Sequence, residues 1–232
     1  MAPSIYAHPG VYEQAFSFRD VPAEVDAILK LTRPPVAGRI LELAAGPAAH
    51  AIELARRGFD VTALDLSPAM ARHAARRAGE ARVALTVVTG DMREVAVPGR
   101  FDLVVTVAGG IGHLASEADL TRHFDSVAAH LAPGGRYLIE TTRPGDRHTR
   151  DRWRLSRGGD RFDVRFGADR LTVRVRHADG RARTFSDRLG LRLWAGHELA
   201  AAARAGGLTV EQRRRSLAGQ SRLVLVLGRQ PD

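Results

Sequence analysis

Short apolar runs alternate with longer segments of helical periodicity between residues 37 and 142. Runs of four to eight apolar residues predict buried strands, whereas apolar residues that recur every three or four positions predict amphipathic helices. This alternation is typical of a parallel sheet that is covered by helices. The strands are expected at residues 39–43, 60–64, 84–89, 101–107 and 136–141, and the helices at 47–57, 67–77 and 116–131.

Capping residues mark several of these boundaries. Ser67 precedes Pro68, a pair typical of a helix start, because the serine accepts a first-turn hydrogen bond and proline needs no partner there. Ser116, with Asp119 three positions later, resembles a capping box. The Pro-Gly-Gly run at 133–135 is expected to turn the chain into the fifth strand.

The apolar period changes to two after the fifth strand. Alternating apolar residues at 162–166, 171–175 and 189–193 predict an antiparallel insertion. Five arginines have the opposite parity and are expected on the other face of this sheet: Arg165, Arg174, Arg176, Arg188 and Arg192. A helix at 197–205 and a hairpin of residues 208–213 and 221–229 should close the chain, with the arginine run 213–215 in a solvated turn of that hairpin.

Composition narrows the class of protein. The absence of cysteine excludes a disulfide scaffold, a thiolate zinc site and a cysteine nucleophile. No run approaches the roughly 20 apolar residues that a membrane span needs, and the first residues lack a charged-then-apolar signal pattern. We therefore expect a cytoplasmic protein that does not associate with membranes.

The basic charge is concentrated in one segment. The formal net charge is +9, and residues 143–192 contain 15 Arg against 7 Asp, which gives 15 − 7 = +8. One interpretation is a solvated face, where charges usually lie. The other is that the field of this segment attracts an anionic substrate.

The turn after the first strand carries the first candidate chemistry. Small residues from Ala44 to Ala48 would let the backbone approach a ligand closely, and Asp65 ends the next strand, where a carboxylate can accept hydrogen bonds from both hydroxyls of a ribose. The glycine pattern of pyrophosphate binders is absent, and Glu42 would repel a pyrophosphate but attract an ammonium group. Asp91 and Met92 together suit an adenine, which has a donor amine and an apolar ring.

In this order, the segments 42–46, Asp65, 90–92, 104–107 and 133–135 resemble the class I, Rossmann-like methyltransferases that depend on S-adenosylmethionine. The resemblance implies a seven-stranded, mostly parallel sheet with helices on both faces and an antiparallel insertion after the fifth strand. It departs from the family at Ala44 and Ala48, where glycines are commoner. The implied cofactor-binding residues are Phe18, Glu42, Ala44, Gly46, Asp65, Leu66, Met70, Gly90, Asp91, Met92, Val107 and Ala108.

The start of the chain and residues 111–114 are similar to methyltransferases that act on small molecules, above all those that N-methylate amino sugars or other amines. This similarity implicates Tyr12, Phe18 and His113, with His113 and Tyr12 as the catalytic residues near the acceptor and His113 as a base or an orienting group. An in-line displacement at a sulfonium methyl needs mainly positioning and the exclusion of water. No cluster with metal-ligand spacing is present, so no metal is expected.

The resemblance also implies one domain built from four segments. These are a helical lid (1–36), the cofactor-binding core (37–142), the insertion over the acceptor site (143–194) and the closing helix with its hairpin (195–232). The sequence is compatible with a monomer or a homodimer.

Two alternatives to a small-molecule methyltransferase stay open. A nucleic-acid methyltransferase would explain the charge, but residues 108–111 lack the Asn/Asp-Pro-Pro-aromatic run of base-flipping enzymes, and the arginines do not interleave with aromatic residues. The second alternative is a related protein that binds the cofactor but does not methylate a substrate. The sequence also leaves open whether nitrogen, oxygen or carbon is methylated.

Overall fold

The computed structural model describes residues 2–142, 151–167 and 170–229. Residues 143–150, with which the insertion was expected to begin, lie outside the described residues. The described helices are η1 (Ile5–Ala7), α1 (Pro9–Ala15), α2 (Val21–Thr32), α3 (Ala49–Arg56), α4 (Pro68–Glu80), η2 (Gly110–His113), α5 (Glu117–His130) and α6 (Gly196–Ala205). The described strands are β1 (Arg39–Leu43), β2 (Asp60–Asp65), β3 (Thr86–Thr89), β4 (Phe101–Thr106), β5 (Leu131–Thr141), β6 (Asp151–Arg157), β7 (Asp160–Phe166), β8 (Arg170–Arg176), β9 (Ala182–Arg188), β10 (Leu208–Leu217) and β11 (Gln220–Arg229).

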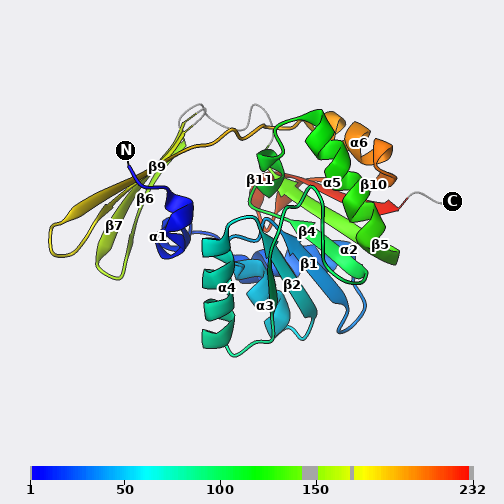
Figure 1. Cartoon of the computed structure of the whole chain (residues 1–232), viewed down its shortest axis with the longest axis horizontal. Helices are drawn as coiled ribbons and strands as arrows, with labels where there is room; N and C mark the ends of the chain where they lie inside the picture. Colours follow the sequence, from blue (N-terminus) through cyan, green and yellow to red (C-terminus); the bar gives the residue numbers. More distant parts are fainter. Residues whose placement is uncertain (1, 143–150, 168–169, 230–232) are drawn as a thin grey trace.

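Seven strands form the main sheet, in the order β10-β11-β5-β4-β1-β2-β3 (Figure 1). The strands β1 to β5 run parallel to their neighbours among themselves, and β11 pairs antiparallel with both β5 and β10. This confirms the predicted fold class. Since parallel strands end at one edge of a sheet, the loops after β1, β2, β3 and β4 meet there.

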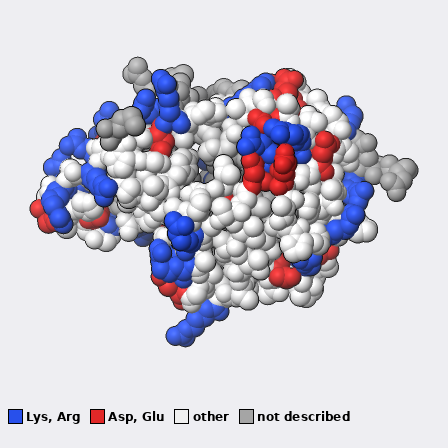
Figure 2. All heavy atoms as spheres, viewed as in Figure 1, with Lys and Arg blue, Asp and Glu red and all other residues white. Residues whose placement is uncertain are grey.

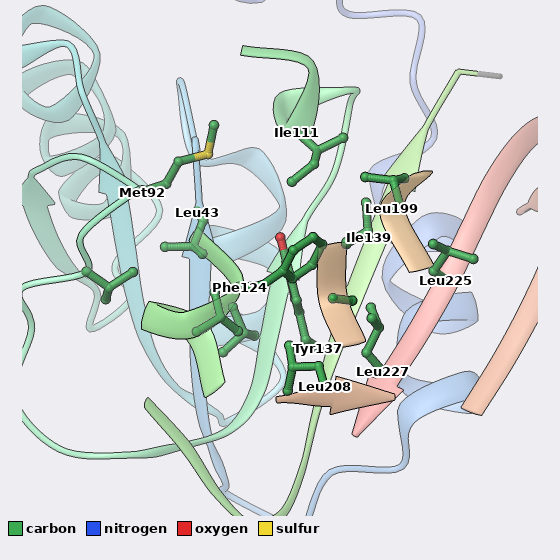
Figure 3. Close-up of a cluster of buried hydrophobic side chains, with 14 of the residues drawn as sticks. Leu43, Met92, Ile111, Phe124, Tyr137, Ile139, Leu199, Leu208, Leu225 and Leu227 are labelled. Carbon is green, nitrogen blue, oxygen red and sulfur yellow. The ribbon is translucent and has the colours of Figure 1, made fainter. Parts of the chain in front are cut away.

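Both faces of the main sheet are buried, which explains the nearly continuous apolar strands. One core contains Leu43, Phe124 and Tyr137, together with side chains from α6 and the closing hairpin (Figure 3). The other core contains Ile40 and Leu103 and packs against α2 and α3.

The predicted caps form as expected. The Ser67 side chain accepts a hydrogen bond from the amide of Met70, and Ser116 accepts one from the amide of Asp119. The strand β5 begins earlier than predicted, because Leu131 pairs with Phe101 before the Pro-Gly-Gly turn.

The insertion is a separate four-stranded antiparallel sheet, in the order β6-β7-β8-β9. Two predicted strands are confirmed as β7 and β8, but the third was placed wrongly, because β9 precedes residues 189–193. Residues 189–193 alternate because they are extended without a strand partner in this sheet: Leu189 packs into its core, while the amide of Arg192 donates to the Gly112 carbonyl. The strand β6 was not predicted.

The two faces of this insertion sheet differ in chemistry. Its apolar side chains, such as Val164 and Val173, pack against Ile5 and Ala15 of the N-terminal segment. Four of the five predicted arginines are exposed and have the strand parity of the other face, as expected: Arg165, Arg174, Arg176 and Arg188. Arg192 is the exception, because its guanidinium lies 3.6 Å from the ring centroid of Trp194 and 2.9 Å from Glu198.

The closing helix and hairpin are confirmed, with longer strands than predicted. The arginine run 213–215 was expected in a turn, but it lies within β10, where all three side chains are exposed. Among the described residues, every helix is too short or too polar to cross a lipid bilayer.

Candidate functional site

A cavity of about 480 Å³ opens at the carboxyl edge of the main sheet. The loops after β1 and β4 form its floor, and its walls come from the N-terminal segment and from the apolar face of the insertion sheet. Eight of the residues predicted from sequence line it: Tyr12, Phe18, Glu42, Ala44, Gly46, Val107, Ala108 and His113. The edge predicted for ligand binding is therefore hollow in the structure.

The loop after β1 takes a tight path. Ala44, Gly46 and Ala48 have left-handed φ angles of 53°, 54° and 57°. Side chains disfavour this region, and glycine adopts it without strain, so the family's glycines at positions 44 and 48 have a physical reason. The path carries the chain from the buried end of β1 into α3 while leaving Gly46 with open space where a Cβ would stand.

Asp65 holds this loop in place. One of its carboxylate oxygens accepts a hydrogen bond from the Gly46 amide at 2.7 Å, and the other accepts one from the Ser67 amide at 2.9 Å. The Gly90 amide donates to the Asp65 carbonyl at 3.0 Å. The loops after β1, β2 and β3 therefore meet at Asp65, which borders the cavity but does not line it.

The other predicted cofactor residues lie around that junction without lining the cavity. Leu66 is 66% exposed, which leaves an apolar side chain open to a ligand at this edge. Asp91 pairs with Arg93, whose hydrogen bond lowers the pKa of Asp91. Met70 and Met92 are buried and belong to the packing of the fold.

Glu42 is a buried carboxylate whose polar contacts include two residues of α3. It accepts a hydrogen bond from the Ala51 amide at 2.8 Å, and its other oxygen lies 3.7 Å from Nδ1 of His50. Burial raises its pKa, although the nearby His50 and the Ala51 amide act in the opposite direction. Glu42 thus fixes the first turn of α3 against the floor of the cavity.

Arg19 joins the N-terminal segment to the core through two buried carboxylates. Its guanidinium lies 2.9 Å from Glu24 and 3.2 Å from Glu140, and only 11% of its side chain is exposed. Glu140 also accepts a hydrogen bond from the Ala108 amide at 2.5 Å and pairs with Arg222 at 2.8 Å. This network fixes the loop after β4 and the start of the chain relative to each other. Sequence reasoning did not single out Arg19, because its partners are distant in the chain.

His113 stands over the cavity at the end of η2. Its side chain is accessible within the cavity, yet the surrounding protein lowers its pKa by burial, against the smaller opposing effect of the Asp65 charge. The imidazole is therefore neutral near pH 7 and has a lone pair to accept a proton.

Two tyrosines accompany His113. The rings of Tyr6 and Tyr12 lie 5.7 Å apart, and Tyr6 meets the His113 ring edge-on at 6.2 Å. Burial, and then the charge of Asp65, raise the pKa of Tyr12 to about 12, and burial also raises that of Tyr6. Both hydroxyls thus keep their protons and can donate hydrogen bonds. Tyr6 was not among the residues predicted for the site.

An aromatic wall continues from Tyr12 into the insertion. Phe16 stacks on Tyr12 at 4.5 Å, and Trp153 of β6 meets Phe16 and Phe18 edge-on at 5.2 and 5.4 Å. The Trp153 indole donates to the carbonyl of Ala15 at 2.8 Å. The wall was missed from sequence because β6 was missed.

Residues 192–194, which follow the insertion sheet, fix the position of η2 through hydrogen bonds. In addition to the bond from Arg192 to the Gly112 carbonyl, the Trp194 indole donates to the Leu114 carbonyl at 2.9 Å. Trp194 is fully buried and does not line the cavity. Within the described ranges, no group of three or more His, Asp or Glu side chains is arranged to hold a metal ion.

Comparison with known proteins agrees with this architecture. Residues 40–135 match the family described as methyltransferase domain. A curated relative from Streptomyces venezuelae, dTDP-3-amino-3,4,6-trideoxy-alpha-D-glucopyranose N,N-dimethyltransferase, is 32% identical over 57% of this chain and 56% of its own length. A second relative from Saccharopolyspora spinosa, dTDP-4-amino-2,3,4,6-tetradeoxy-D-glucose N,N-dimethyltransferase, is 32% identical over 59% of this chain and 56% of its own length. The matched region thus spans about half the length of these curated relatives.

Solved structures extend the similarity over nearly the whole chain. The structure of DesVI from Streptomyces venezuelae has a TM-score of 0.82, is 26% identical and covers 94% of this chain and 97% of its own. An amino pentose methyltransferase from Micromonospora echinaspora has a TM-score of 0.80 at 26% identity, covering 95% of this chain and 97% of its own. In its fold, its loop after β1 and these matches, the chain is similar to class I, Rossmann-like methyltransferases.

Proposed function

We propose that the protein transfers a methyl group from S-adenosylmethionine to an amine of a small, anionic acceptor. The observation that carries this proposal is that one cavity brings neutral His113 and the protonated Tyr6 and Tyr12 together with the left-handed loop Ala44–Ala48. The names of the relatives, which act on amino groups of dTDP-linked sugars, support an amine in a nucleotide-linked molecule.

The residues present fit the cofactor. Gly46 leaves open space beside the loop, the Asp65 carboxylate has acceptor capacity beyond its two amide partners, and Leu66 offers an exposed apolar surface next to it. We propose that Asp65 holds the ribose, that Leu66 covers the adenine and that Phe18 closes over the methyl-donor end. Asp91, Met92 and Met70 would shape the pocket from behind. S-adenosylmethionine supplies a methyl group activated by a positively charged sulfur.

The chain's own residues would position and deprotonate the acceptor. An amine is mostly protonated near pH 7 and becomes a nucleophile when it loses a proton. Neutral His113 accepts that proton, and the hydroxyls of Tyr6 and Tyr12 orient the acceptor for in-line attack. The aromatic wall of Phe16 and Trp153 excludes water from the reacting atoms.

The sequence suggested that the field of the basic segment 143–192 attracts an anionic acceptor, whereas the structure suggests a more local reason for a negatively charged acceptor. Most arginines of the insertion strands have the parity of the face opposite to Phe166 and Leu171, which line the cavity. Arg157 and Arg183 have the parity of the cavity side but do not line the cavity, so the strand arginines would act on the acceptor only through their long-range field. Arg192 and Arg222 line the cavity directly. We propose that these cavity arginines face the anionic part of the acceptor.

Calorimetric titration with S-adenosylmethionine, S-adenosylhomocysteine and NADH tests the cofactor assignment. We expect micromolar binding of the first two and none of NADH. Incubation with S-adenosylmethionine and dTDP-amino sugars, followed by mass spectrometry, then tests transfer. The formation of S-adenosylhomocysteine with an acceptor heavier by one methyl group is expected. Cofactor binding without turnover of any amine would contradict the proposed reaction, and the absence of cofactor binding would contradict the proposed site.

A further inference from the structure

The solvent face of the insertion sheet is a dense array of arginines that the proposed reaction does not use. Among the described residues, this face carries one acidic side chain, Asp163, and eight exposed arginines: Arg152, Arg154, Arg161, Arg165, Arg170, Arg174, Arg176 and Arg188. Blue atoms gather over the lobe that contains this sheet, at the left of Figure 2. The described part of this face therefore has an excess of seven positive charges.

Several of these arginines stand directly opposite one another across paired strands. The register pairs Arg152 with Arg165, Arg161 with Arg176, and Arg170 with Arg188. Cβ atoms of directly opposed residues are about 5 Å apart, and like charges at that spacing destabilise a sheet. Asp163 compensates Arg152 and Arg165, and Arg188 has a partner of its own, so the electrostatic cost that a bound anion would relieve lies at Arg161 and Arg176.

Asp163 neutralises one side of the array. It pairs with Arg152 and lies 3.2 Å from Arg154 and 3.6 Å from Arg165. Within the described part of the chain, Arg161, Arg174 and Arg176 have no carboxylate within ion-pair distance and no other hydrogen-bonded partner.

These three uncompensated arginines border a groove of about 410 Å³, together with Arg154, Leu155, Ser156, Phe162 and Asp163. Since Asp163 is paired with Arg154, the guanidiniums of Arg161, Arg174 and Arg176 and the Ser156 hydroxyl are the groups of this concave surface that can receive an anion. An extended, flexible anion of several charges fits this arrangement better than a single carboxylate does.

The aromatic and aliphatic side chains of the insertion lie on its other face. Phe162 and Leu155 border the groove, but Phe162 is only 2% exposed and Leu155 packs against the core that faces the N-terminal segment. The described part of this face therefore has no open ring on which a base could stack and no apolar patch to enter a lipid layer. The recognition available here is of phosphate groups. Guanidinium forks bind phosphate oxygens in pairs, which makes such contacts both strong and directional.

We propose that the groove between Arg161, Arg174 and Arg176 is a second ligand site, which binds a small molecule through a chain of two or more phosphates. The site lies on the face of the insertion sheet opposite to the methylation cavity. The inference does not depend on the proposed reaction, because it stands on this sheet face alone.

Calorimetry with inorganic tripolyphosphate tests the proposal on the full chain without a methyl donor. The groove variant is Arg161→Gln/Arg176→Gln. The control variant, Arg214→Gln/Arg215→Gln, loses the same two charges from exposed positions on β10. Arg176→Lys keeps the charge but removes the fork, and so tests the geometry if the double variant folds poorly.

We expect one equivalent of tripolyphosphate to bind the unaltered chain and the control, and the groove variant to bind it about tenfold or more weakly. In phosphate-free, low-salt buffer, the groove variant should melt a few degrees above the unaltered chain, because an unfavourable charge pair is gone. Tripolyphosphate should raise the melting temperature of the unaltered chain but not that of the groove variant.

Three results would overturn the proposal. The first is the absence of saturable binding by the unaltered chain. The second is an equal loss of affinity in the control, which would mean that net charge and not the groove binds the anion. The third is binding of a DNA duplex or of phosphatidylserine vesicles that tripolyphosphate does not displace, which would assign the face to a macromolecular surface.

Discussion

The hydroxyl of Tyr137, a core residue labelled in Figure 3, lies 2.8 Å from Nε2 of His123 on α5, and both side chains are fully buried. Nδ1 of His123 lies 2.7 Å from the Met92 carbonyl oxygen, so Nδ1 carries the hydrogen and Nε2 accepts from the tyrosine. The Thr106 hydroxyl lies 2.7 Å from that of Tyr137 and donates to it. A chain of hydrogen bonds therefore connects the end of β4 with the loop after β3.

Tyr137→Phe should lower the free energy of unfolding by about 1–3 kcal/mol, since it leaves the buried Nε2 atom and the Thr106 hydroxyl without their partner. Urea denaturation followed by circular dichroism measures the change. Tyr137→Phe combined with Thr106→Val and His123→Leu should recover part of the loss. An unchanged midpoint in the single variant would contradict the assigned hydrogen bonds.

The stability of the protein should depend on His123 between about pH 6.5 and pH 4. Burial, opposed by the hydrogen bond to the Met92 carbonyl, lowers the pKa of His123 to about 4, whereas in the unfolded chain it is near 6.5. The unfolded state therefore binds a proton first as the pH falls, which destabilises the fold by up to about 3 kcal/mol. The stability contribution is fully present above pH 6.5 and is lost towards pH 4. His123→Gln should remove this part of the pH profile, and parallel profiles for the two proteins would refute the assignment.

Ala48→Gly should stabilise the fold by about 0.5–1 kcal/mol. The φ angle of Ala48 is 57°, a left-handed conformation that strains an alanine but not a glycine. The free energy gained by removing this strain should exceed the free energy lost because glycine increases the entropy of the unfolded chain. Ala55→Gly is the matched control, because Ala55 lies inside α3, where the same replacement should cost about 1 kcal/mol. Thermal melts of both variants decide the sign. Destabilisation by both would show that the loop after β1 is not strained at Ala48.

Arg19→Gln should destabilise the fold by about 3 kcal/mol, since it leaves the buried carboxylates of Glu24 and Glu140 without their shared cation. Arg56→Gln is the control, because Arg56 is half exposed and its pair with Glu53 is worth less than 1 kcal/mol. Chemical denaturation gives both values. Equally small decreases in the free energy of unfolding of both variants would show that Arg19 does not stabilise the attachment of the N-terminal segment to the core.

Asp65→Ala and His113→Gln should separate cofactor binding from turnover. Asp65→Ala removes the acceptor of the Gly46 and Ser67 amides and the proposed ribose anchor, and should weaken S-adenosylmethionine binding by roughly 1.5–3 kcal/mol. His113→Gln should leave that affinity unchanged and lower kcat. Calorimetry and steady-state kinetics make the two measurements. Normal cofactor affinity in the Asp65 variant would show that the ribose lies elsewhere.

The core of the fold was predictable because its signals are local. The strands β1, β2 and β4 are buried on both faces and so appear as mainly apolar runs in the sequence. Ser67 and Ser116 are the capping residues directly before α4 and α5, and they mark where these helices begin. The edge on which Asp65 and His113 lie follows from the parallel order of the strands.

What the sequence did not reveal depends on contacts between distant segments. In β6, Trp153 and Leu155 alternate with arginines over too few positions to stand out, so the aromatic wall was missed. Arg19 acquires its role from Glu140, 121 positions away. Residues 189–193 have the period of a strand, but the hydrogen bond from Arg192 goes to η2 instead of to a neighbouring strand.

The roof of the cavity joins the first residues of the chain to residues near position 186. The Ser186 amide donates to the Pro3 carbonyl, and the Ile5 amide donates to Asp187 at 2.7 Å. Contacts of such large sequence separation form slowly, because the chain must lose the entropy of closing a long loop before these contacts can stabilise it. Tyr6 and Tyr12 are synthesised before the insertion, so we expect them to reach their final positions only after the insertion has formed. We therefore expect the part of the molecule that encloses the cavity to fold last, and its amides to exchange with solvent sooner than those of β1 and β4.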